Sequence, residues 1–424
     1  MTKTNEVEVI LVGSELLKGE RSDRHLAFIG RLLLAVGVRL NEAHVVADDK
    51  SRLARLIRDR ARAARVVVIT GGLGPTHDDI TRESVAEAFG VPLEFYEDEW
   101  EKIERIFQRL GGRADDSNRR QAYFPRGAEP IANARGTAAG FVMDREGCLV
   151  AALPGPPREL IPMVEDAVLE RIGGVFGRRG IYCETFRTTG IGESNMTPMV
   201  KSIFDKYDEF VFSSLPHIGG VDIVITQQRE DVDRSFIEAR ANEFEQELRA
   251  VLGFRVYGKG DADLAAVLGR ELVNQEATLA IAESLTGGWI GKRITDVAGS
   301  SRYLLADVVA YDNPAKLTLL DVKTEFLEKH GAVSAAVCRE MAEGIRQRTG
   351  ATYGLATTGI AGPGGGSKEK PVGLSYYGLT WDGGGDIRDH VFPGNREDVR
   401  ERVTYAALFL LFRRLRSRLE VDPA

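Results

Sequence analysis

The sequence is poor in cysteine, and this scarcity excludes two kinds of small, cross-linked fold. Its 424 residues include only Cys148, Cys183 and Cys338, which lie far apart and are odd in number. A disulfide framework uses an even set of cysteines, and a structural zinc site uses closely spaced CxxC-type pairs. Neither pattern is present, so we expect the fold to rest on hydrophobic cores.

A surplus of positive charge and a long apolar run are also missing. The chain carries 56 Lys and Arg against 63 Asp and Glu, a formal charge of −7, whereas duplex-binding proteins usually show a basic excess or face. The most apolar stretches, such as Ala407–Phe412, are far below the ~18 residues of a membrane span. No basic segment precedes the first apolar run as it does in a signal peptide. We therefore expect a cytoplasmic protein that binds neither membranes nor nucleic acid.

The length and the apolar content predict several globular domains. A chain of 424 residues with 43% hydrophobic residues is too long for one ordinary core and can fill two or three. We place the domains at residues 1–172, 173–260 and 261–424, with the first break in the glycine-rich stretch Gly173–Gly177. The first and third segments have the pattern of α/β domains. The middle one has the pattern of a small α+β domain without a catalytic cluster.

Strands and helices alternate in the first segment and predict a parallel sheet. Apolar, β-branched runs at Val7–Val12, Val45–Val46 and Arg65–Thr70 alternate with helices expected after Asp23 and Asp49. In this order the strands are parallel and the crossovers right-handed. Ligands of such sheets bind at the carboxyl ends of the strands.

A glycine-rich turn after the third of these strands carries the first candidate site. Asp78 and Asp79 follow the turn just before a helix, and Glu15 follows the first strand at the same sheet edge. Backbone amides at such a turn approach an anion closely, and carboxylates beside phosphates require a divalent cation such as Mg²⁺. The alternative is that the glycines only make the turn and the aspartates only charge the helix start. The glycines are Gly71, Gly72 and Gly74.

The second candidate site lies where a strand of the last segment ends in Ser284. The turn Thr286-Gly287-Gly288 follows, so backbone amides can stabilise an oxyanion while the serine attacks a carbonyl. The flanks are not Gly-x-Ser-x-Gly, which excludes the α/β-hydrolase elbow. Lys316 is the candidate base if burial lowers its pKa, and Tyr311 is a candidate proton relay. The alternatives are that Ser284 caps a helix and that Lys316 is an ordinary surface lysine.

Several blocks of the first segment resemble a known family. Gly71–Asp79, Asn118–Pro125, Asn133–Phe141 and Pro154–Glu159, which contains Gly155, are similar to the molybdopterin-binding domain as it occurs in CinA (competence/damage-inducible protein A) proteins. The resemblance implies a three-layer α/β domain. In CinA-like proteins this domain is associated with hydrolysis of ADP-ribose that depends on a divalent metal (Mg, Mn or Co), which suits a glycine turn with acidic residues.

The last segment closely resembles the C-terminal CinA domain, the nicotinamide-nucleotide amidohydrolase family. The resemblance implies an α/β amidohydrolase domain without a cofactor, with Ser284 as nucleophile, Lys316 as base and Tyr311 assisting. It also implies that Thr358 and Arg396 line the site, with Arg396 meeting the nucleotide phosphate, and that Gly359 belongs to the substrate-binding loops. The matching blocks are Glu283–Gly288, Ala298–Ser301, Tyr311–Lys316, Gly331–Ser334 and Thr358–Pro363.

Together these resemblances imply a bifunctional hydrolase of pyridine-nucleotide salvage. One site converts nicotinamide mononucleotide to nicotinate mononucleotide and ammonia; the other splits ADP-ribose into AMP and ribose 5-phosphate. CinA-like proteins are expected to be homodimers. Two other functions stay open, a DNA-uptake or repair accessory without catalysis and a molybdopterin-binding transferase. The acidic charge argues against the first. Leu73, where molybdopterin-handling members usually have threonine, argues against the second.

Overall fold

The chain forms two compact units in the computed structural model, Met1–Cys183 and Glu184–Ala424. The structure describes residues 4–23, 25–36, 38, 40–176, 181–228 and 232–421. Within these ranges, no helix combines the length and the apolar character that crossing a bilayer requires.

A six-stranded mixed sheet forms the centre of the first unit. Four of its strands are parallel, as the sequence predicts, and two antiparallel strands extend it on one side. The strand that reverses direction is joined to its neighbour by Glu146 and Gly147, both with positive φ, which is the geometry of a two-residue hairpin. In spatial order the strands are β2 (Leu40–Val46), β1 (Thr4–Val12), β3 (Ala64–Thr70), β8 (Cys148–Leu153), β7 (Gly140–Arg145) and β6 (Glu129–Ile131).

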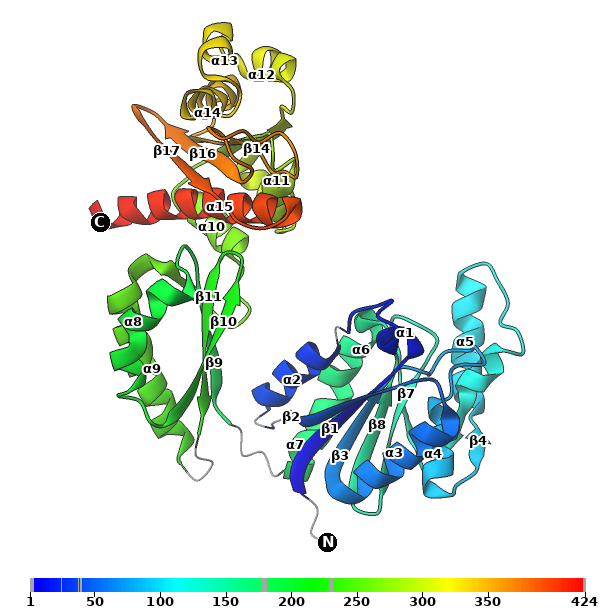
Figure 1. Ribbon diagram of the computed structural model, residues 1–424. Helices are drawn as coiled ribbons and strands as arrows, with labels where there is room; N and C mark the ends of the chain where they lie inside the picture. The colour runs from blue at the N-terminus through cyan, green and yellow to red at the C-terminus, as the bar shows by residue number, and fades with distance from the viewer. Residues whose placement is uncertain are drawn as a thin grey trace. The chain divides into compact units, whose positions relative to one another are not determined.

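Helices cover both faces of this sheet, which confirms the three-layer α/β arrangement (Figure 1). On one face Ile29 and Leu33 pack against Val9 and Val66. The helices of this face are α2 (His25–Ala35), α6 (Pro157–Met163) and α7 (Leu169–Phe176), with the π-helical turn η2 (Val164–Val168) between the last two. The other face carries α3 (Lys50–Ala63) and α4 (Thr81–Phe89).

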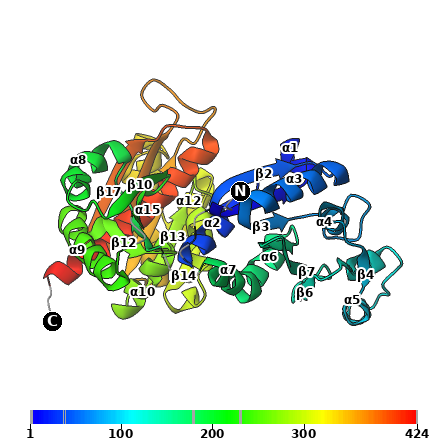
Figure 2. The same ribbon diagram turned by 90° about the horizontal axis from the view of Figure 1, so that it is seen from below.

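A smaller group of elements completes the first unit. It includes the two-stranded sheet β4–β5, and Figure 2 shows α5 beside β4. The remaining elements are α1 (Ser14–Leu17), β4 (Leu93–Phe95), α5 (Glu97–Arg109), η1 (Asn118–Ala122) and β5 (Tyr123–Pro125).

The glycine-rich stretch in which we predict the first domain break begins inside α7, which ends at Phe176. Gly173 and Gly174 lie inside α7, and Gly177 lies outside the described residues. Ile172 and Val168 are buried against the sheet in this region. Burial of an apolar helix face outweighs the roughly 1 kcal/mol that each glycine costs a helix.

The second unit begins with a four-stranded sheet that carries two helices on one face (Figure 1). From the sequence we expect helices at Met199–Tyr207 and Val232–Leu252 and strands at Val221–Thr226 and Phe254–Tyr257. The structure has these elements with shifted ends, α8 beginning at Glu193, and it adds β9 and β10. Much of β10 is exposed, so it lacks the apolar alternation that marks a strand. The elements are β9 (Cys183–Thr188), α8 (Glu193–Phe204), β10 (Phe210–His217), β11 (Gly220–Gln227), α9 (Arg234–Leu252), η3 (Gly253–Arg255) and β12 (Val256–Lys259).

The rest of the second unit is a five-stranded sheet between two helical layers (Figure 1). Three strands are parallel and two are antiparallel. Their spatial order is β14 (Leu304–Val309), β13 (Leu279–Glu283), β15 (Tyr353–Gly359), β16 (Leu374–Trp381) and β17 (Gly384–Val391). One layer holds α12 (Asn313–Leu320), α13 (Thr324–His330) and α14 (Ala335–Thr349); the other holds α10 (Leu264–Asn274), α11 (Trp289–Thr295) and α15 (Arg396–Val421).

Candidate functional site

The carboxyl ends of β1, β3 and β8 border a cavity of about 1230 Å³ in the first unit. This is the edge at which a parallel sheet binds ligands. All residues that the sequence proposes for this site line the cavity, namely Glu15, Gly71, Gly72, Gly74, Asp78, Asp79 and Gly155.

The turn after β3 requires glycine because the backbone itself comes close to its neighbours. Gly71 has φ +97°, and a Cβ there would lie 2.4 Å from the Val12 carbonyl oxygen. Its amide donates to the Leu153 carbonyl at 2.9 Å, which ties the ends of β3 and β8 together. Thr81, the first residue of α4, donates from Oγ1 to the Gly71 carbonyl at 2.7 Å. The turn is thus fixed before any ligand arrives.

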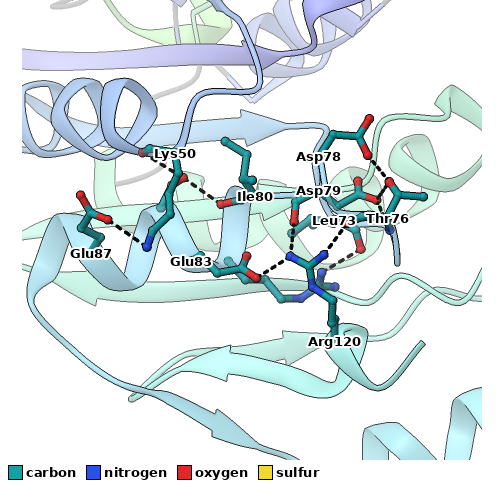
Figure 3. Close-up of polar contacts among 11 residues, drawn as sticks. Lys50, Leu73, Thr76, Asp78, Asp79, Ile80, Glu83, Glu87 and Arg120 are labelled. Atoms are coloured by element: carbon teal, nitrogen blue, oxygen red, sulfur yellow. Dashed lines mark hydrogen bonds and ion pairs between the residues drawn. The ribbon is translucent and has the colours of Figure 1, made fainter. Parts of the chain in front are cut away.

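Asp78 and Asp79 do not cap the helix that follows them. The Thr76 hydroxyl donates to both carboxylates, at 2.6 Å to Asp79, as Figure 3 shows. This hydrogen bond holds the pKa of Asp78 below its usual value, so the carboxylate is ionised at neutral pH. A helix-capping contact is thus absent, but the alternative of a charge near the helix start stays open. The exposed, ionised carboxylate is also available to a cation.

A buried arginine lies behind the glycine turn. The Arg82 guanidinium donates to the Leu73 carbonyl at 2.8 Å and to the Ala139 carbonyl at 3.2 Å, and only 3% of the residue is exposed. Burial lowers the pKa of Arg82 to about 10, so it still carries its charge at neutral pH. A positive charge in a poorly solvated position favours an anion at the turn. Arg120 ties the turn to α4, because it donates to the Thr76 carbonyl at 2.6 Å and to Glu83 at 2.8 Å (Figure 3).

The three proposed metal ligands share the cavity but are not assembled around one point. Within the described ranges, only Glu8, Glu42 and His44 bring three ligand atoms within 4.8 Å of one another. That cluster already has a cation beside it, because Arg60 Nη1 lies 3.6 Å from Glu8 and 3.4 Å from Glu42. We interpret it as an ion-pair network of β1 and β2.

Ser284 and Lys316 meet in the second unit, 32 positions apart in sequence. Lys316 Nζ lies 3.3 Å from Ser284 Oγ, and the two residues are only 1% and 8% exposed. Asp312 positions the lysine, because its side chain accepts from the Ala315 amide at 2.9 Å and caps α12 one turn before Lys316. The surface-lysine alternative is therefore wrong for Lys316.

The environment of Lys316 favours a neutral amine more than water does. Burial lowers the pKa of Lys316 from its ordinary value, an effect that Asp312 partly opposes. The amine donates to the carbonyls of Ala310 at 2.9 Å, Tyr311 at 3.0 Å and Asp312 at 3.4 Å. When it loses a proton, the amine keeps two N–H bonds for the two closer carbonyls and gains a lone pair for the Ser284 hydroxyl, which is the arrangement that a general base requires.

The turn after Ser284 is capped by its neighbour Glu283. The fully buried Glu283 carboxylate accepts from the amides of Gly288 and Gly291, both at 2.9 Å. Since Glu283 caps α11, the helix-cap alternative for Ser284 is wrong and its hydroxyl faces Lys316. The Gly287 amide donates to the Ser284 carbonyl at 3.2 Å. Among the described residues, the Leu285 and Thr286 amides have no acceptor, so they are the candidate oxyanion donors.

The other residues proposed for this site lie around the pair rather than against it. Thr286 hydrogen-bonds Thr357 at 2.7 Å, and Thr358 donates to the Ala332 carbonyl at 2.9 Å. A Cβ on Gly359 would lie 2.7 Å from the Leu374 carbonyl, so this glycine is set by strand packing. These residues shape the floor of the site.

Tyr311 and Arg396 meet each other at the mouth of the site. Tyr311 is 59% exposed, and its hydroxyl accepts from Arg396 Nη2 at 2.9 Å. The hydroxyl makes no described hydrogen bond to Ser284 or Lys316; only the Tyr311 carbonyl contacts the lysine. The structure thus brings Tyr311 to the arginine that we expect to meet the phosphate, and the proton-relay role stays a prediction.

A second cavity, of about 780 Å³, opens beside this mouth. Asn395 caps α15 by accepting from the Glu397 and Asp398 amides at 2.8 and 3.1 Å. The cap fixes the register of Arg396 and of Arg400 one turn later, both of which line the cavity together with Trp289. Arg400 is not predicted from the sequence, although the Asn-x-x-Asp cap and the (i, i+4) spacing from Arg396 are signals that point to it.

Comparison with known proteins assigns the chain to a family. The CinA C-terminal domain matches residues 261–415, a probable molybdopterin binding domain matches 8–173, and a damage-inducible protein CinA KH domain matches 184–258. A putative competence-damage inducible protein of Moorella thermoacetica is 38% identical over 416 residues, 98% of this chain and 100% of the relative. This chain belongs to the CinA family. One relative from Clostridium acetobutylicum, with the same description, is 38% identical over 95% of this chain and 97% of its own length.

Solved CinA structures match parts of this CinA-family chain. A crystal structure of CinA from Thermoplasma acidophilum is 33% identical and covers 40% of this chain and 99% of its own, with a TM-score of 0.37. A competence/damage-inducible protein from Agrobacterium tumefaciens is 36% identical over 36% of this chain and 96% of its own, with a TM-score of 0.33. The family models and the Moorella thermoacetica relative confirm the family resemblance stated from the sequence blocks. The middle segment, predicted only to be α+β, matches a KH domain.

Proposed function

We propose that the chain is a hydrolase with two separate sites: the C-terminal part deamidates nicotinamide mononucleotide, and the N-terminal domain hydrolyses ADP-ribose to AMP and ribose 5-phosphate. The observation that carries the first half is the buried contact of 3.3 Å between Lys316 Nζ and Ser284 Oγ. The second half rests on the glycine turn and carboxylates around one cavity at the sheet edge.

In the deamidation, Ser284 Oγ attacks the carboxamide carbon while its proton passes to Lys316 Nζ. The carbonyl electron pair moves onto oxygen, where the free amides of Leu285 and Thr286 donate to the oxyanion. When the oxyanion collapses, the C–N bond breaks, and the leaving nitrogen takes the proton from Lys316 and departs as ammonia. Water then attacks the acyl carbon, gives a proton to Lys316, and releases the carboxylate product as Ser284 regains its proton.

The mouth of the second site suits a nucleotide phosphate. Arg396 is exposed and lines the cavity with Arg400 and Trp289. Its guanidinium, already directed by Tyr311 and the Gly362 carbonyl, offers the planar donors that phosphate prefers. This contact would orient the substrate so that its carboxamide reaches Ser284.

In the first site, the turn amides and the buried Arg82 attract the diphosphate, whose P–O–P bond a water molecule breaks. Asp78, Asp79 and Glu15 all line the cavity and supply the oxygen donors that Mg²⁺ or Mn²⁺ binds. Their donor chemistry fits a divalent ion, although the three carboxylates must move closer together to share it. When bound, such an ion screens the negative charges and polarises a phosphoryl oxygen.

The direct test is to incubate the purified full chain with each nucleotide separately. Ammonia and nicotinate mononucleotide should appear from nicotinamide mononucleotide, and AMP from ADP-ribose. The Ser284→Ala variant should lose deamidation by roughly 10³-fold or more while still releasing AMP. If this variant released ammonia at the wild-type rate, the assignment of Ser284 as nucleophile would be abandoned.

A further inference from the structure

Arg400 contacts the backbone of the Ser284 turn. Its Nε donates to the Leu285 carbonyl at 3.1 Å, and its Nη2 donates to the Thr286 carbonyl at 2.8 Å. The guanidinium carbon also lies 4.1 Å from the centre of the Trp289 ring, so the cation is stacked as well as hydrogen-bonded. In the described parts of the chain, no carboxylate pairs with Arg400 within 4.0 Å. The peptide carbonyls are thus its main polar partners.

These two hydrogen bonds fix the direction of a peptide amide. A trans peptide places its carbonyl and its N–H on opposite sides, so holding the Leu285 carbonyl toward Arg400 turns the Thr286 amide away from it. The amide of the next peptide, at Gly287, already donates to the Ser284 carbonyl. The Thr286 amide is therefore left free and aimed by the arginine. A cation on the carbonyl oxygen also polarises the peptide and strengthens its N–H as a donor.

The two arginines of α15 that line the second cavity, Arg396 and Arg400, have different surroundings. Arg396 is exposed, and its guanidinium donates to the Tyr311 hydroxyl at the mouth of the site. Arg400 is half-buried, and two of its N–H groups donate to carbonyls of the Ser284 turn. A Cβ on Gly287, which has φ +59°, would lie 3.2 Å from Arg400 Nη2, so the turn and the arginine fit closely. This division leaves phosphate binding to Arg396.

We propose that Arg400 is a positioning residue that holds the Ser284 turn so that the Thr286 amide can donate to the oxyanion of the amide substrate. This inference rests on the proposed deamidation. Arg400 does not touch the reacting atoms: when the Ser284 oxygen bonds to the carbon and the carbonyl electrons move to oxygen, the amide that Arg400 aims receives the charge.

The test compares Arg400→Met with Arg416→Met. Arg416 lies on the same helix, pairs with Glu271 at 2.8 Å and contacts the Phe412 ring, so its removal controls for loss of an arginine from α15. With nicotinamide mononucleotide, we expect kcat of Arg400→Met to fall about 10- to 100-fold with KM changed less than about threefold. The Arg416 variant should keep both values. Guanidinium ion added to Arg400→Ala should restore part of the lost kcat.

A second measurement does not depend on the substrate. Deuterium uptake by the 284–291 segment of the Arg400→Met protein should rise relative to wild type and to Arg416→Met. If the Met variant does not fold, Arg400→Lys serves, because a point charge cannot hold both carbonyls. If the wild-type protein does not deamidate the nucleotide, the proposed function is wrong. If deuterium uptake still rises in Arg400→Met, Arg400 then only stabilises the turn and has no catalytic role. Unchanged kcat, a rise in KM alone, or unchanged uptake overturns the inference.

Discussion

Lys316 is surrounded by oxygen atoms, and they set how its charge responds to pH. The carbonyls of Ala310, Tyr311 and Asp312 accept from its amine, and Ser284 Oγ lies 3.3 Å from it. Burial lowers the lysine pKa, whereas Asp312 raises it, and the first effect is larger. Because a folded pKa below the ordinary value means easier loss of the proton, the neutral base becomes available at a lower pH than for a free lysine.

Deamidation should therefore increase with pH and level off above the lowered pKa of Lys316. Lys316→Arg keeps the charge but cannot act as a base, so we expect a loss of about 10²- to 10⁴-fold in kcat. The pH dependence of ammonia release measures both effects, with ADP-ribose hydrolysis as the internal control. An Arg variant with wild-type activity would show that Lys316 is only an electrostatic contact.

Asp78 offers a matching test in the first unit. Asp78→Asn removes one negative oxygen but can still accept from Thr76, and its exposed position predicts a change in unfolding free energy within about 0.5 kcal/mol. The concentration of Mg²⁺ that gives half-maximal ADP-ribose hydrolysis should rise at least about tenfold. Glu87→Gln, an exposed acid on α4 that pairs with Lys50, should leave this concentration unchanged. Equal metal titrations for both variants would remove Asp78 from the ligand set.

At this scale the sequence identified the residues that end strands but not the residues that support them. Ser284 and the Gly71 turn are visible because each follows an apolar run and precedes a helix. Arg82 and Arg400 are not predicted because the feature that distinguishes them is a tertiary contact. Each lies on a helix and donates to a carbonyl of a glycine-containing turn. In a linear sequence each looks like an ordinary helix arginine.

At the scale of elements, the contact between α12 and α14 fixes where Lys316 stands. A Cβ on Gly344 of α14 would lie 1.8 Å from the Leu320 carbonyl oxygen, at the end of α12. Gly344→Ala must therefore push α12 aside, which we expect to cost about 1–3 kcal/mol in unfolding free energy and to lower deamidation by moving the lysine. Chemical denaturation and ammonia release measure this. Gly174→Ala, whose Cβ meets nothing within 4 Å, is the control; identical behaviour of the two would contradict the close packing.

The N-terminus of α11 and the neighbouring strand β14 share a pair of acids. Although Asp307 is exposed along the strand, its carboxyl lies against Gly291; burial, with Glu283 as the second cause, raises the pKa of Asp307 to about 7. Between pH 3.8, the ordinary pKa of an aspartate, and about pH 7, the folded protein holds this proton more tightly than the unfolded chain. Stability contributed by the protonated pair is therefore lost as pH rises through that window.

Asp307→Asn should remove this pH dependence. The amide is neutral at every pH, so the variant should gain stability relative to wild type at pH 8 but not at pH 4. Denaturant unfolding at the two pH values, followed by a signal from the C-terminal part, measures the difference. If the variant is destabilised equally at both, Asp307 acts through a contact other than its coupling to Glu283.

Among the elements, those with a buried apolar face were predictable, and half-exposed ones were not. α14 carries clear signals in the sequence: the Ser334 cap, which accepts from the Val337 amide at 3.3 Å, and the apolar face with the buried Met341 and Ile345. β10 exposes Val211 and Leu215, so it has no continuous buried face. A half-exposed strand therefore leaves too weak an apolar pattern to be found from the sequence alone.

At the scale of the whole molecule, the two candidate sites lie in different compact units, and we propose that they use different chemistry. In the proposed deamidation, Ser284 and Lys316 act as nucleophile and base and the Leu285 and Thr286 amides as oxyanion donors, so the chain itself supplies every group. The cavity with Asp78, Asp79 and Glu15 gathers negative charge beside an expected diphosphate, which requires a cation. The two reactions should therefore respond independently to metal removal and to mutation.

The most direct test of this account measures ammonia and AMP release by the full chain with and without EDTA, for wild type, Ser284→Ala and Asp78→Asn. We expect EDTA to abolish AMP formation from ADP-ribose and to leave deamidation intact, Asp78→Asn to act in the same direction as EDTA, and Ser284→Ala to do the reverse. The opposite pattern, in which EDTA stops ammonia release but spares AMP release, would contradict the assignment of the two chemistries to the two units.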